Sequence, residues 1–239
     1  MTAPRFWALT DVGAVRKHNE DNLLSRPDLG LWVVADGAGG HESGEVASAM
    51  IVEALGGLPA ELNAGALISS IRLAVAQVHA ALRAEAARRG GNAMLASTVV
   101  CLMIRDGHFA CLWAGDSRGY LLRGGQLQQI THDHSLVQEL VDSGALSPED
   151  AERHPHANVI TRAVGADDDD MELDKVIGQA QPGDRFLLCS DGLSKTLSET
   201  EIRNLLAAPE GMPPTELLIG AALARSVNDN VTAIVVEVG

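Results

Sequence analysis

Three acidic motifs stand at the ends of apolar runs that lie far apart in the chain. Asp36 and Asp191 each follow such a run, and Asp229 precedes one. A carboxylate at the end of a buried strand is costly unless another charge or a ligand compensates it. Carboxylate oxygens are also ligands that hard divalent cations prefer. The pattern therefore requires a fold that brings three distant strand ends together, and it predicts a cation site where they meet.

The order of the predicted elements favours an α+β fold. Strands come first, followed by two helices, several strands, a small helical excursion, more strands, two helices and a last strand. This order lacks the regular strand–helix alternation of a doubly wound sheet. We expect a central β-sandwich of two mostly antiparallel sheets, flanked by pairs of helices in four layers (α/β/β/α). Residues 1–239 form one domain in this prediction, and residues 132–158 form a small helical flap.

Alternating and continuous apolar runs predict strands, and apolar positions spaced by three and four predict helices. The predicted strands are 6–11, 22–25, 29–35, 98–105, 108–114, 119–123, 172–177, 185–189 and 231–238. The predicted helices are 43–57, 64–89, 135–142, 147–152, 198–207 and 214–226. The turns Asp106-Gly107 and Gly124-Gly125 predict hairpins.

Charge and cysteine content narrow the functional classes. The net charge of −14 argues against a nucleic-acid surface and against docking on an anionic membrane. We find no signal peptide and no run that approaches the length of a membrane span. The cysteines, Cys101, Cys111 and Cys189, each lie in a predicted strand without zinc-site spacing, which indicates reduced core residues in a cytosolic protein. The run 167–170 contains only aspartates, and we interpret it as a solvated turn.

Each acidic motif has a simpler interpretation when it is taken alone. Asp36-Gly37 is typical of a tight turn, although the glycines at 37, 39 and 40 would also let the backbone approach an ion closely. The loop lacks the spacing of a nucleotide-binding motif. Upstream, Arg16 could pair with a phosphate, and Glu20 and Asp21 could hold metal-bound waters. The alternative there is a surface turn with a weak local ion pair.

Taken in order, the motifs resemble those of the metal-dependent type-2C protein phosphatases, in particular the compact bacterial serine/threonine phosphatases. The motifs span residues 16 to 232, and they are Arg16-x-x-Asn19-Glu20-Asp21, Asp36-Gly37-x-Gly39-Gly40-His41-x-x-Gly44-Glu45-x-Ala47-Ser48, Ala114-Gly115-Asp116-Ser117-Arg118, Thr131-x-Asp133-His134-Ser135, Ile160-Thr161-Arg162-Ala163-x-Gly165, Ser190-Asp191-Gly192-Leu193 and Asp229-Asn230-Val231-Thr232. The resemblance implies the same sandwich of two antiparallel sheets, with the helical excursion as its flap.

The resemblance also implies roles for individual residues. Asp36 would bridge two Mn²⁺ or Mg²⁺ ions, the Gly37 carbonyl would complete the shell of one ion, and Glu20 would contribute through water. Asp191 and Asp229 would hold the other ion. Two such cations would activate a water and neutralise the phosphoryl oxygens, so that no protein nucleophile is needed.

Asp116, together with Asp191, matches a third metal site that the resemblance places in bacterial members. Arg16 would receive the substrate phosphate. Arg16 and Asp36 are therefore the predicted catalytic residues, Arg16 is also the predicted substrate-binding residue, and the cofactor would be two ions, with room for a third.

The proton donor to the leaving alkoxide stays open. Some members of the family carry a histidine directly after Asp-Gly, where this chain has Ala38. His41 is one candidate for the acid, and helix capping or packing is the alternative. The same choice between a substrate contact and structural pairing applies to two histidines and two arginines, namely His132, His134, Arg118 and Arg162.

The expected function is metal-dependent hydrolysis of phosphoserine and phosphothreonine in proteins by a metal-activated water, reversing a protein kinase in bacterial signalling. The expected partners are a phosphorylated protein and its cognate serine/threonine kinase, with no nucleic acid or membrane, and we expect a cytoplasmic monomer. The alternative is a metal-binding scaffold of the same fold that docks a partner without significant catalysis. A narrower hypothesis keeps the phosphatase activity and makes the protein a dedicated regulator, such as the dephosphorylating partner of a secretion-system kinase or of an anti-anti-sigma factor.

Overall fold

The computed structural model describes residues 3–39, 43–90, 93–151, 154–166, 171–208 and 211–239. The strands are β1 (Arg5–Asp11), β2 (Asp21–Arg26), β3 (Leu31–Ala38), β4 (Ala96–Ser97), β5 (Val99–Arg105), β6 (His108–Ala114), β7 (Arg118–Arg123), β8 (Gln126–Gln129), β9 (Asp174–Gln179), β10 (Arg185–Cys189) and β11 (Val231–Glu237). The helices are α1 (Ser43–Gly56), α2 (Ala64–Arg89), α3 (Leu136–Asp142), α4 (Pro148–Ala151), α5 (Asp191–Ser194), α6 (Glu199–Leu206) and α7 (Pro214–Ala224).

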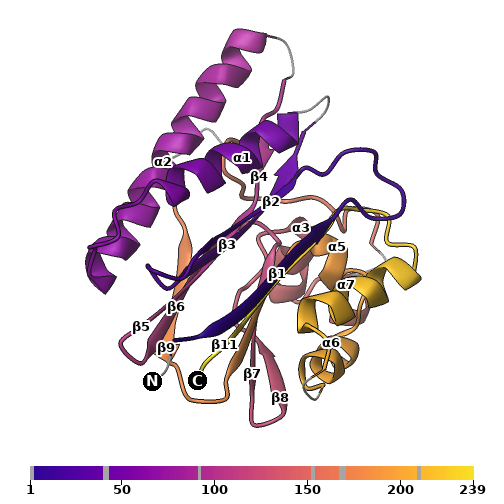
Figure 1. The fold of residues 1–239 in the computed structure, drawn as a ribbon. Coiled ribbons are helices and arrows are strands. Elements are labelled where there is room, and N and C mark those ends of the chain that lie inside the picture. The colour runs from indigo at the N-terminus through magenta and orange to yellow at the C-terminus, as the bar shows by residue number, and fades with distance from the viewer. Residues whose placement is uncertain (1–2, 40–42, 91–92, 152–153, 167–170, 209–210) are drawn as a thin grey trace.

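Two β-sheets form the centre of the molecule. One has the strand order β1-β11-β10-β7-β8, and the other has the order β2-β3-β5-β6-β9, with β4 paired to β3. The strand pairs are antiparallel in both sheets. Figure 1 shows α1 and α2 on one side of the sheets and α6 and α7 on the other. The predicted α+β sandwich of two antiparallel sheets flanked by helix pairs is confirmed.

The central strands have continuous apolar runs because both of their faces are buried. Successive residues of a strand point to opposite faces of the sheet. On β3, Val33 packs beneath α1 and α2, whereas Trp32 points between the two sheets. On β10, Phe186 also points between the sheets, and Leu187 packs against the helices of the opposite side. Three apolar layers therefore separate four layers of secondary structure.

Helix α2 carries the predicted apolar face. Leu67, Ile71, Val75, Val78 and Leu82 are buried, and they pack in the cluster between the helices and the six-stranded sheet. By length and composition alone, α2 is also long and apolar enough to cross a membrane, contrary to the expectation that no run approaches the length of a membrane span. Core helices of folded proteins can meet the same criterion, and α2 packs in the core between the helices and the six-stranded sheet.

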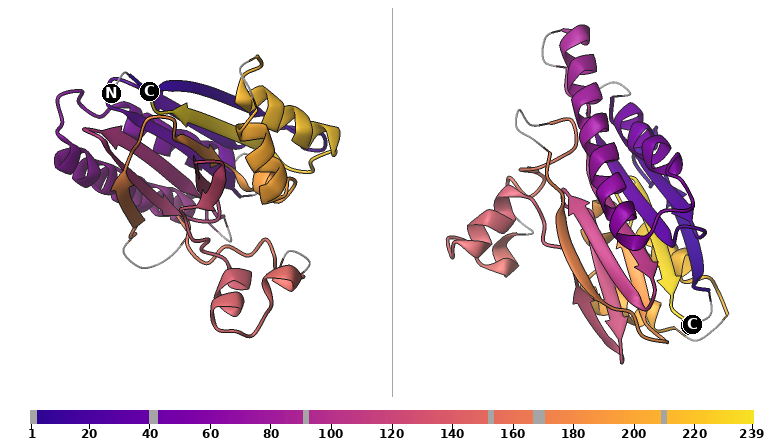
Figure 2. Two further views of the ribbon diagram at one scale, coloured as in Figure 1. Left: turned by 90° about the horizontal axis from the view of Figure 1, so that it is seen from below. Right: turned by 90° about the vertical axis from the view of Figure 1, so that its left-hand side faces the viewer.

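A small helical segment stands apart from the sandwich (Figure 2, left), and we call residues 136–151 and 154–158 the projecting segment. It contains α3 and α4, neither of which has a buried residue. Its two ends are held together, because the Leu136 amide donates to the Val159 carbonyl at 2.9 Å and the Thr161 amide donates to the His134 carbonyl at 2.9 Å. The projecting segment corresponds to the flap expected at 132–158.

The observed elements differ from the predicted ones mainly near turns. Strand β3 does not end before the first acidic motif but continues through it to Ala38, because Gly37 and Ala38 pair with β4. The two-residue strand β4, the polar strand β8 and the four-residue helix α5 were not predicted. The three cysteines are buried and unpaired, as expected.

Candidate active site

Five aspartates gather at one end of the sandwich. Asp36 lies near the end of β3, and Asp21 lies directly opposite it at the start of β2. Asp191 follows β10, Asp229 precedes β11, and Asp116 lies in the turn between β6 and β7. Because neighbouring antiparallel strands run in opposite directions, a residue after one strand and a residue before the next lie at the same edge. The topology therefore places these carboxylates together.

The electrostatics of Asp36 show how close these carboxylates are. Asp36 is only partly exposed. Burial raises its pKa well above the usual range, and the negative charges of Asp21, Asp191, Asp116 and Asp229 raise it further. A like charge has such an effect only at short range. The carboxylates at positions 36, 191 and 229 thus lie close enough in the fold for their charges to interact.

Asp21 connects the two sheets. Its side chain is 5% exposed, and its Oδ2 accepts hydrogen bonds from Ser190 Oγ and Thr232 Oγ1, each at 2.7 Å. Burial raises the pKa of Asp21 to about 7, although the two hydroxyl donors oppose this shift. Asp21 therefore joins β2 of one sheet to β11 and the end of β10 in the other.

Asp116 and Asp191 share a lysine. Lys195 Nζ donates to Asp191 Oδ2 at 2.6 Å and to Asp116 Oδ2 at 3.0 Å. Burial and the negative charge of Asp191 together raise the pKa of Asp116 to about 6, and Lys195 opposes the shift. Burial opposes the charge on Lys195 too, but the two carboxylates raise its pKa above the usual range. The other oxygen of Asp116, Oδ1, is buried and has no hydrogen-bond partner among the described residues.

Arg16 is oriented by the segment before β11. Its Nη2 donates to Asp229 Oδ2 at 2.9 Å, and its Nε donates to the Asn228 carbonyl at 3.3 Å. Asn230 fixes the loop that carries Arg16, because its side-chain amide donates to the Val12 carbonyl at 2.9 Å and its Oδ1 accepts from the Glu20 amide at 2.9 Å. About half of the Arg16 side chain remains exposed. The guanidinium is thus held in place and still accessible.

Two glycines permit the close approach of the backbone segments at the site. A Cβ at Gly37 would lie 2.2 Å from the Gly44 carbonyl oxygen and 2.7 Å from the Glu20 carbonyl oxygen. A Cβ at Gly192 would lie 2.0 Å from the Asn230 carbonyl oxygen. Side chains do not fit at such distances. These glycines therefore allow the segments with the predicted metal ligands to touch.

A cleft of about 670 Å³ opens over the carboxylates. Its lining includes Arg16, Asp191 and Lys195, together with Val137 and Asn158 of the projecting segment. Lys195 Nζ also donates to Asn158 Oδ1 at 3.0 Å, so one side chain joins the projecting segment to the carboxylates. The cleft thus contains the positively charged side chains of Arg16 and Lys195 and buried carboxylates, and part of its lining comes from the projecting segment.

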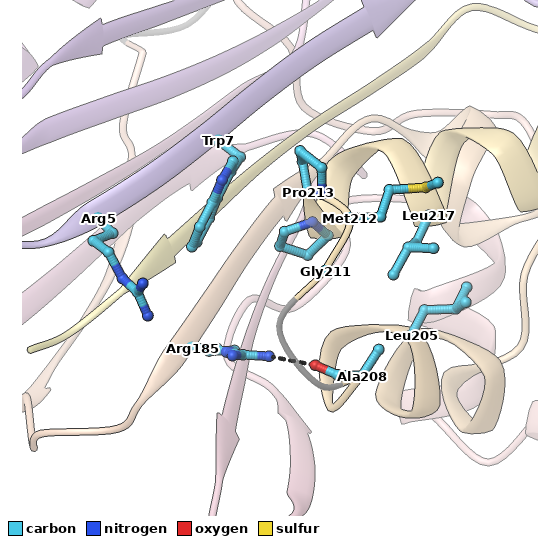
Figure 3. A pocket seen from close by; sticks show the side chains of 10 residues that line it. Arg5, Trp7, Arg185, Leu205, Ala208, Gly211, Met212, Pro213 and Leu217 are labelled. Carbon is cyan, nitrogen blue, oxygen red and sulfur yellow. Dashed lines mark hydrogen bonds between the residues drawn. The ribbon is translucent and has the colours of Figure 1, made fainter.

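A second hollow, of about 270 Å³, lies between β1 and helices α6 and α7 (Figure 3). Its arginines are engaged in structural contacts. Arg5 and Arg185 both pair with Glu237, and Arg185 Nη1 donates to the carbonyls of Leu206 and Ala208. Figure 3 shows the last of these bonds as a dashed line. With its charges committed to the fold, this hollow is a weaker candidate site than the cleft.

The remaining candidate residues are in structural contacts. Arg118 pairs with buried Asp133 at 2.7 Å, and Arg162 pairs with Asp174 at 2.7 Å. The ring of His134 accepts from the Gly115 amide at 3.1 Å and stacks on Trp113. The ring of His132 lies 2.7 Å from Asp142 Oδ2. His41 and the aspartate run 167–170 lie outside the described residues, so the choice for His41 between general acid and helix capping or packing stays open.

The site fits divalent cations by its charge balance. Asp36 and its four acidic neighbours face two side-chain cations, Arg16 and Lys195. An excess of partly buried carboxylates is stabilised by further positive charge, and carboxylate oxygens are ligands that divalent cations prefer. Within the described ranges, no group of three or more aspartate, glutamate, histidine or cysteine side chains is arranged so that it could hold a metal ion as it stands. Several carboxylates instead point at Arg16 and Lys195.

Sequence reasoning missed Lys195 and Asn158. A local signal for Lys195 did exist, because it follows Asp191 by four residues, a spacing at which side chains on a helix meet. Its second contact, with Asp116, crosses 79 positions in the sequence and could not be anticipated. Asn158 carries no motif of its own.

Comparisons with known proteins identify the family of this chain. A family model described as protein phosphatase 2C matches residues 14–215. The serine/threonine protein phosphatase PstP of Mycobacterium tuberculosis is 38% identical over 234 residues, which cover 98% of this chain and 45% of PstP. The chain therefore spans about half the length of that relative.

Solved structures resemble this one over almost its full length. A structure described as PppA, a key regulatory component of T6SS in Pseudomonas aeruginosa, is 44% identical with a TM-score of 0.91, covering 99% of this chain and 98% of that one. The catalytic domain of the serine/threonine phosphatase PstP in complex with two manganese ions is 36% identical with a TM-score of 0.87, covering 99% of both chains. The fold and the motifs thus point to one family.

Proposed function

Since this chain belongs to the protein phosphatase 2C family, we propose that it hydrolyses phosphoserine and phosphothreonine in proteins with Mn²⁺ or Mg²⁺. The observation that carries this proposal is the group of carboxylates around Asp36, with exposed Arg16 beside it at the mouth of a cleft. The similarity to PstP, which has been solved with two manganese ions, supports the choice of cofactor.

In this proposal the carboxylates of Asp36, Asp191 and Asp229 and the carbonyl of Gly37 hold two cations, and Glu20 contributes through water. The bound cations activate water and neutralise phosphoryl oxygens, which is the chemistry that a phosphomonoester dianion requires. The protein holds these ligands rigidly, because each lies at the end of a strand of the sandwich. Such positioning lowers the barrier by presenting the reacting groups in a fixed geometry.

Arg16 binds the substrate phosphate in the same proposal. Its bonds to Asp229 and the Asn228 carbonyl fix the guanidinium plane, and its half-exposed side chain lines the cleft. A guanidinium recognises phosphate through paired N–H donors as well as through charge. We assign Arg16 to binding and orientation.

We further propose that the substrate is a phosphorylated protein, that a cognate serine/threonine kinase opposes this enzyme, and that the protein is a cytoplasmic monomer without a nucleic-acid or membrane partner. The buried, unpaired cysteines fit a reducing compartment, and the charge of −14 disfavours anionic surfaces. The similarity to PppA supports a regulatory role of this kind.

The test is hydrolysis of p-nitrophenyl phosphate and of matched phosphoserine, phosphothreonine and phosphotyrosine peptides, with Mn²⁺, with Mg²⁺ and with excess chelator. We expect metal-dependent release from the first two peptides and little from the third. Asp36→Asn should lower kcat by about 100-fold or more. Replacing a residue that merely hydrogen-bonds to a metal ligand already lowers activity by about 10–100-fold, and loss of the ligand itself should lower it at least as much. Asp28→Asn, at an exposed surface carboxylate, should not change kcat.

Two results would contradict the proposal. Full activity after exhaustive chelation would rule out metal-dependent hydrolysis. Binding of Mn²⁺ without turnover of any of the phosphorylated compounds would favour the alternative, a scaffold that docks a partner.

A further inference from the structure

Lys195 is bonded to three acceptors in the cleft. Its Nζ donates to Asp191, Asp116 and Asn158 at 2.6, 3.0 and 3.0 Å. An ammonium group has three donors, and all three are used here. The Lys195 side chain is 36% exposed, and the other lysines of the chain, Lys17 and Lys175, are exposed as well. What fixes the position of the Lys195 ammonium group is therefore its three bonds and not burial.

The two carboxylates that Lys195 joins need a cation. Asp116 is 3% exposed, and the Asp191 side chain is 17% exposed. Two carboxylates so close together and so poorly hydrated repel each other unless positive charge lies between them. In this structure the positive charge between them belongs to the chain itself.

We propose that Lys195 is a tethered cation that takes the place of a third divalent ion at Asp116 and Asp191. The inference rests on the proposed function in that it assigns the neighbouring carboxylates to a metal centre. A metal ion entering between Asp116 and Asp191 would have to displace the ammonium group and break its bond to Asn158. Because Lys195 is attached to the same short helix as Asp191, its effective concentration at this pair is high, as for any intramolecular partner. The chain therefore binds two ions where Asp116 and Asp191 alone would allow three.

The first test counts bound ions without any turnover. Mn²⁺ is titrated into metal-free protein at pH 7 and up to millimolar concentration, with free Mn²⁺ followed by electron paramagnetic resonance. The wild type should bind two ions, Lys195→Gln should bind three, and Lys195→Gln combined with Asp116→Asn should return to two. Lys175→Gln, at an exposed position on β9, is the matched control and should bind two.

The outcomes separate this inference from the proposed function. Three ions in the wild type, or two in Lys195→Gln, would overturn the inference and leave the phosphatase proposal intact. No bound ion in the wild type would overturn both.

A second test uses only the wild type, so it does not depend on the folding of a variant. Amine acetylation followed by mass spectrometry of the peptides should modify Lys17 and Lys175 and spare Lys195. We expect this protection to persist when Mn²⁺ is raised to millimolar concentration. If Mn²⁺ exposed Lys195 to acetylation, the ion would be displacing the ammonium group, and the inference would be wrong.

Discussion

The numbers of negatively and positively charged side chains in the cleft determine which ligands it can bind. Asp36 and its acidic neighbours outnumber the nearby cations Arg16 and Lys195. The three donors of the Lys195 ammonium group are all used and its side chain is 36% exposed, whereas Arg16 makes two bonds and about half of its side chain is exposed. Arg16 is therefore the better placed of the two to meet a phosphate.

Replacing Arg16 tests this division of roles. Arg16→Ala should lower kcat/KM for p-nitrophenyl phosphate by about 10–100-fold, because a charge-assisted hydrogen bond of about 1.5–3 kcal/mol is lost. Arg16→Lys should recover only part of the loss, since lysine keeps the charge but not the paired donors. Lys17→Ala, at the exposed neighbouring position, serves as the control in steady-state kinetics. Equal kcat/KM for Arg16→Ala and the wild type would exclude Arg16 from substrate binding.

The raised pKa of Asp21 predicts how pH acts on the metal-free protein. Burial raises this pKa to about 7, so the folded protein retains a proton that the unfolded chain releases above about pH 4. The stability of the folded state should therefore fall as the pH rises from about 4 to about 7. In excess chelator, the melting temperature of Asp21→Asn should fall less steeply over this range than that of the wild type. Asp28→Asn should keep the wild-type slope, and an equal slope in Asp21→Asn would contradict the prediction.

At the scale of elements, the site depends on how closely the strand ends approach one another. Segments that carry Asp191 and Asp229 touch through their backbones at Gly192. The segments that carry Asp36 and Glu20 touch in the same way at Gly37. Backbone contact at these two points sets the spacing of the predicted ligands more directly than any side-chain bond does.

Gly192→Ala should disrupt that spacing. Its Cβ would lie 2.0 Å from the Asn230 carbonyl oxygen, so the backbone must move. We expect a loss of about 1–3 kcal/mol in the free energy of unfolding, as for overpacking elsewhere, together with weaker Mn²⁺ binding. Gly220→Ala in α7 is the matched control, because its Cβ would meet open space and should stabilise the helix by about 1 kcal/mol. Urea unfolding and Mn²⁺ titration compare the two variants. If Gly192→Ala kept the wild-type stability and Mn²⁺ affinity, the close approach of the backbone at Gly192 to Asn230 would not be required.

The elements themselves were largely predictable, and the exceptions have physical reasons. Helix α2 and strands β5 and β6 have strong periodic patterns over seven residues or more, and the structure places them within about one residue of the prediction. Strand β4 has two residues and helix α5 has four, too few to show any period. Strand β8 is mostly polar because half of its residues are exposed, so it lacks an apolar signal.

At the scale of the whole molecule, the core between the sheets holds the site together. Phe186 and Ile234 of one sheet pack there with Trp32 and Phe109 of the other. The rings of Phe109 and Phe186 lie 4.9 Å apart between their centroids. Because the predicted metal ligands come from both sheets, the relative position of the sheets determines whether these ligands meet.

Phe186→Ala should destabilise the whole fold. Phe186 is fully buried, and truncation of such a residue costs about 3–5 kcal/mol through lost burial and the cavity that remains. Ile177→Ala, at a side chain that is 53% exposed, should change the free energy of unfolding by less than about 0.5 kcal/mol. Equilibrium urea denaturation measures both variants. A loss below about 1 kcal/mol for Phe186→Ala would mean that this part of the core is not tightly packed.

The sequence by itself determined the longer strands and helices and the acidic residues near strand ends, because periodicity and turn chemistry are local properties. Only the tertiary structure decided that Asp21 lies opposite Asp36, that Asp21 reaches Ser190 and Thr232 in the other sheet, and that Lys195 joins its helix to the projecting segment. These contacts depend on strand order and register. Both follow from the burial of whole faces across long sequence separations, which no local pattern records.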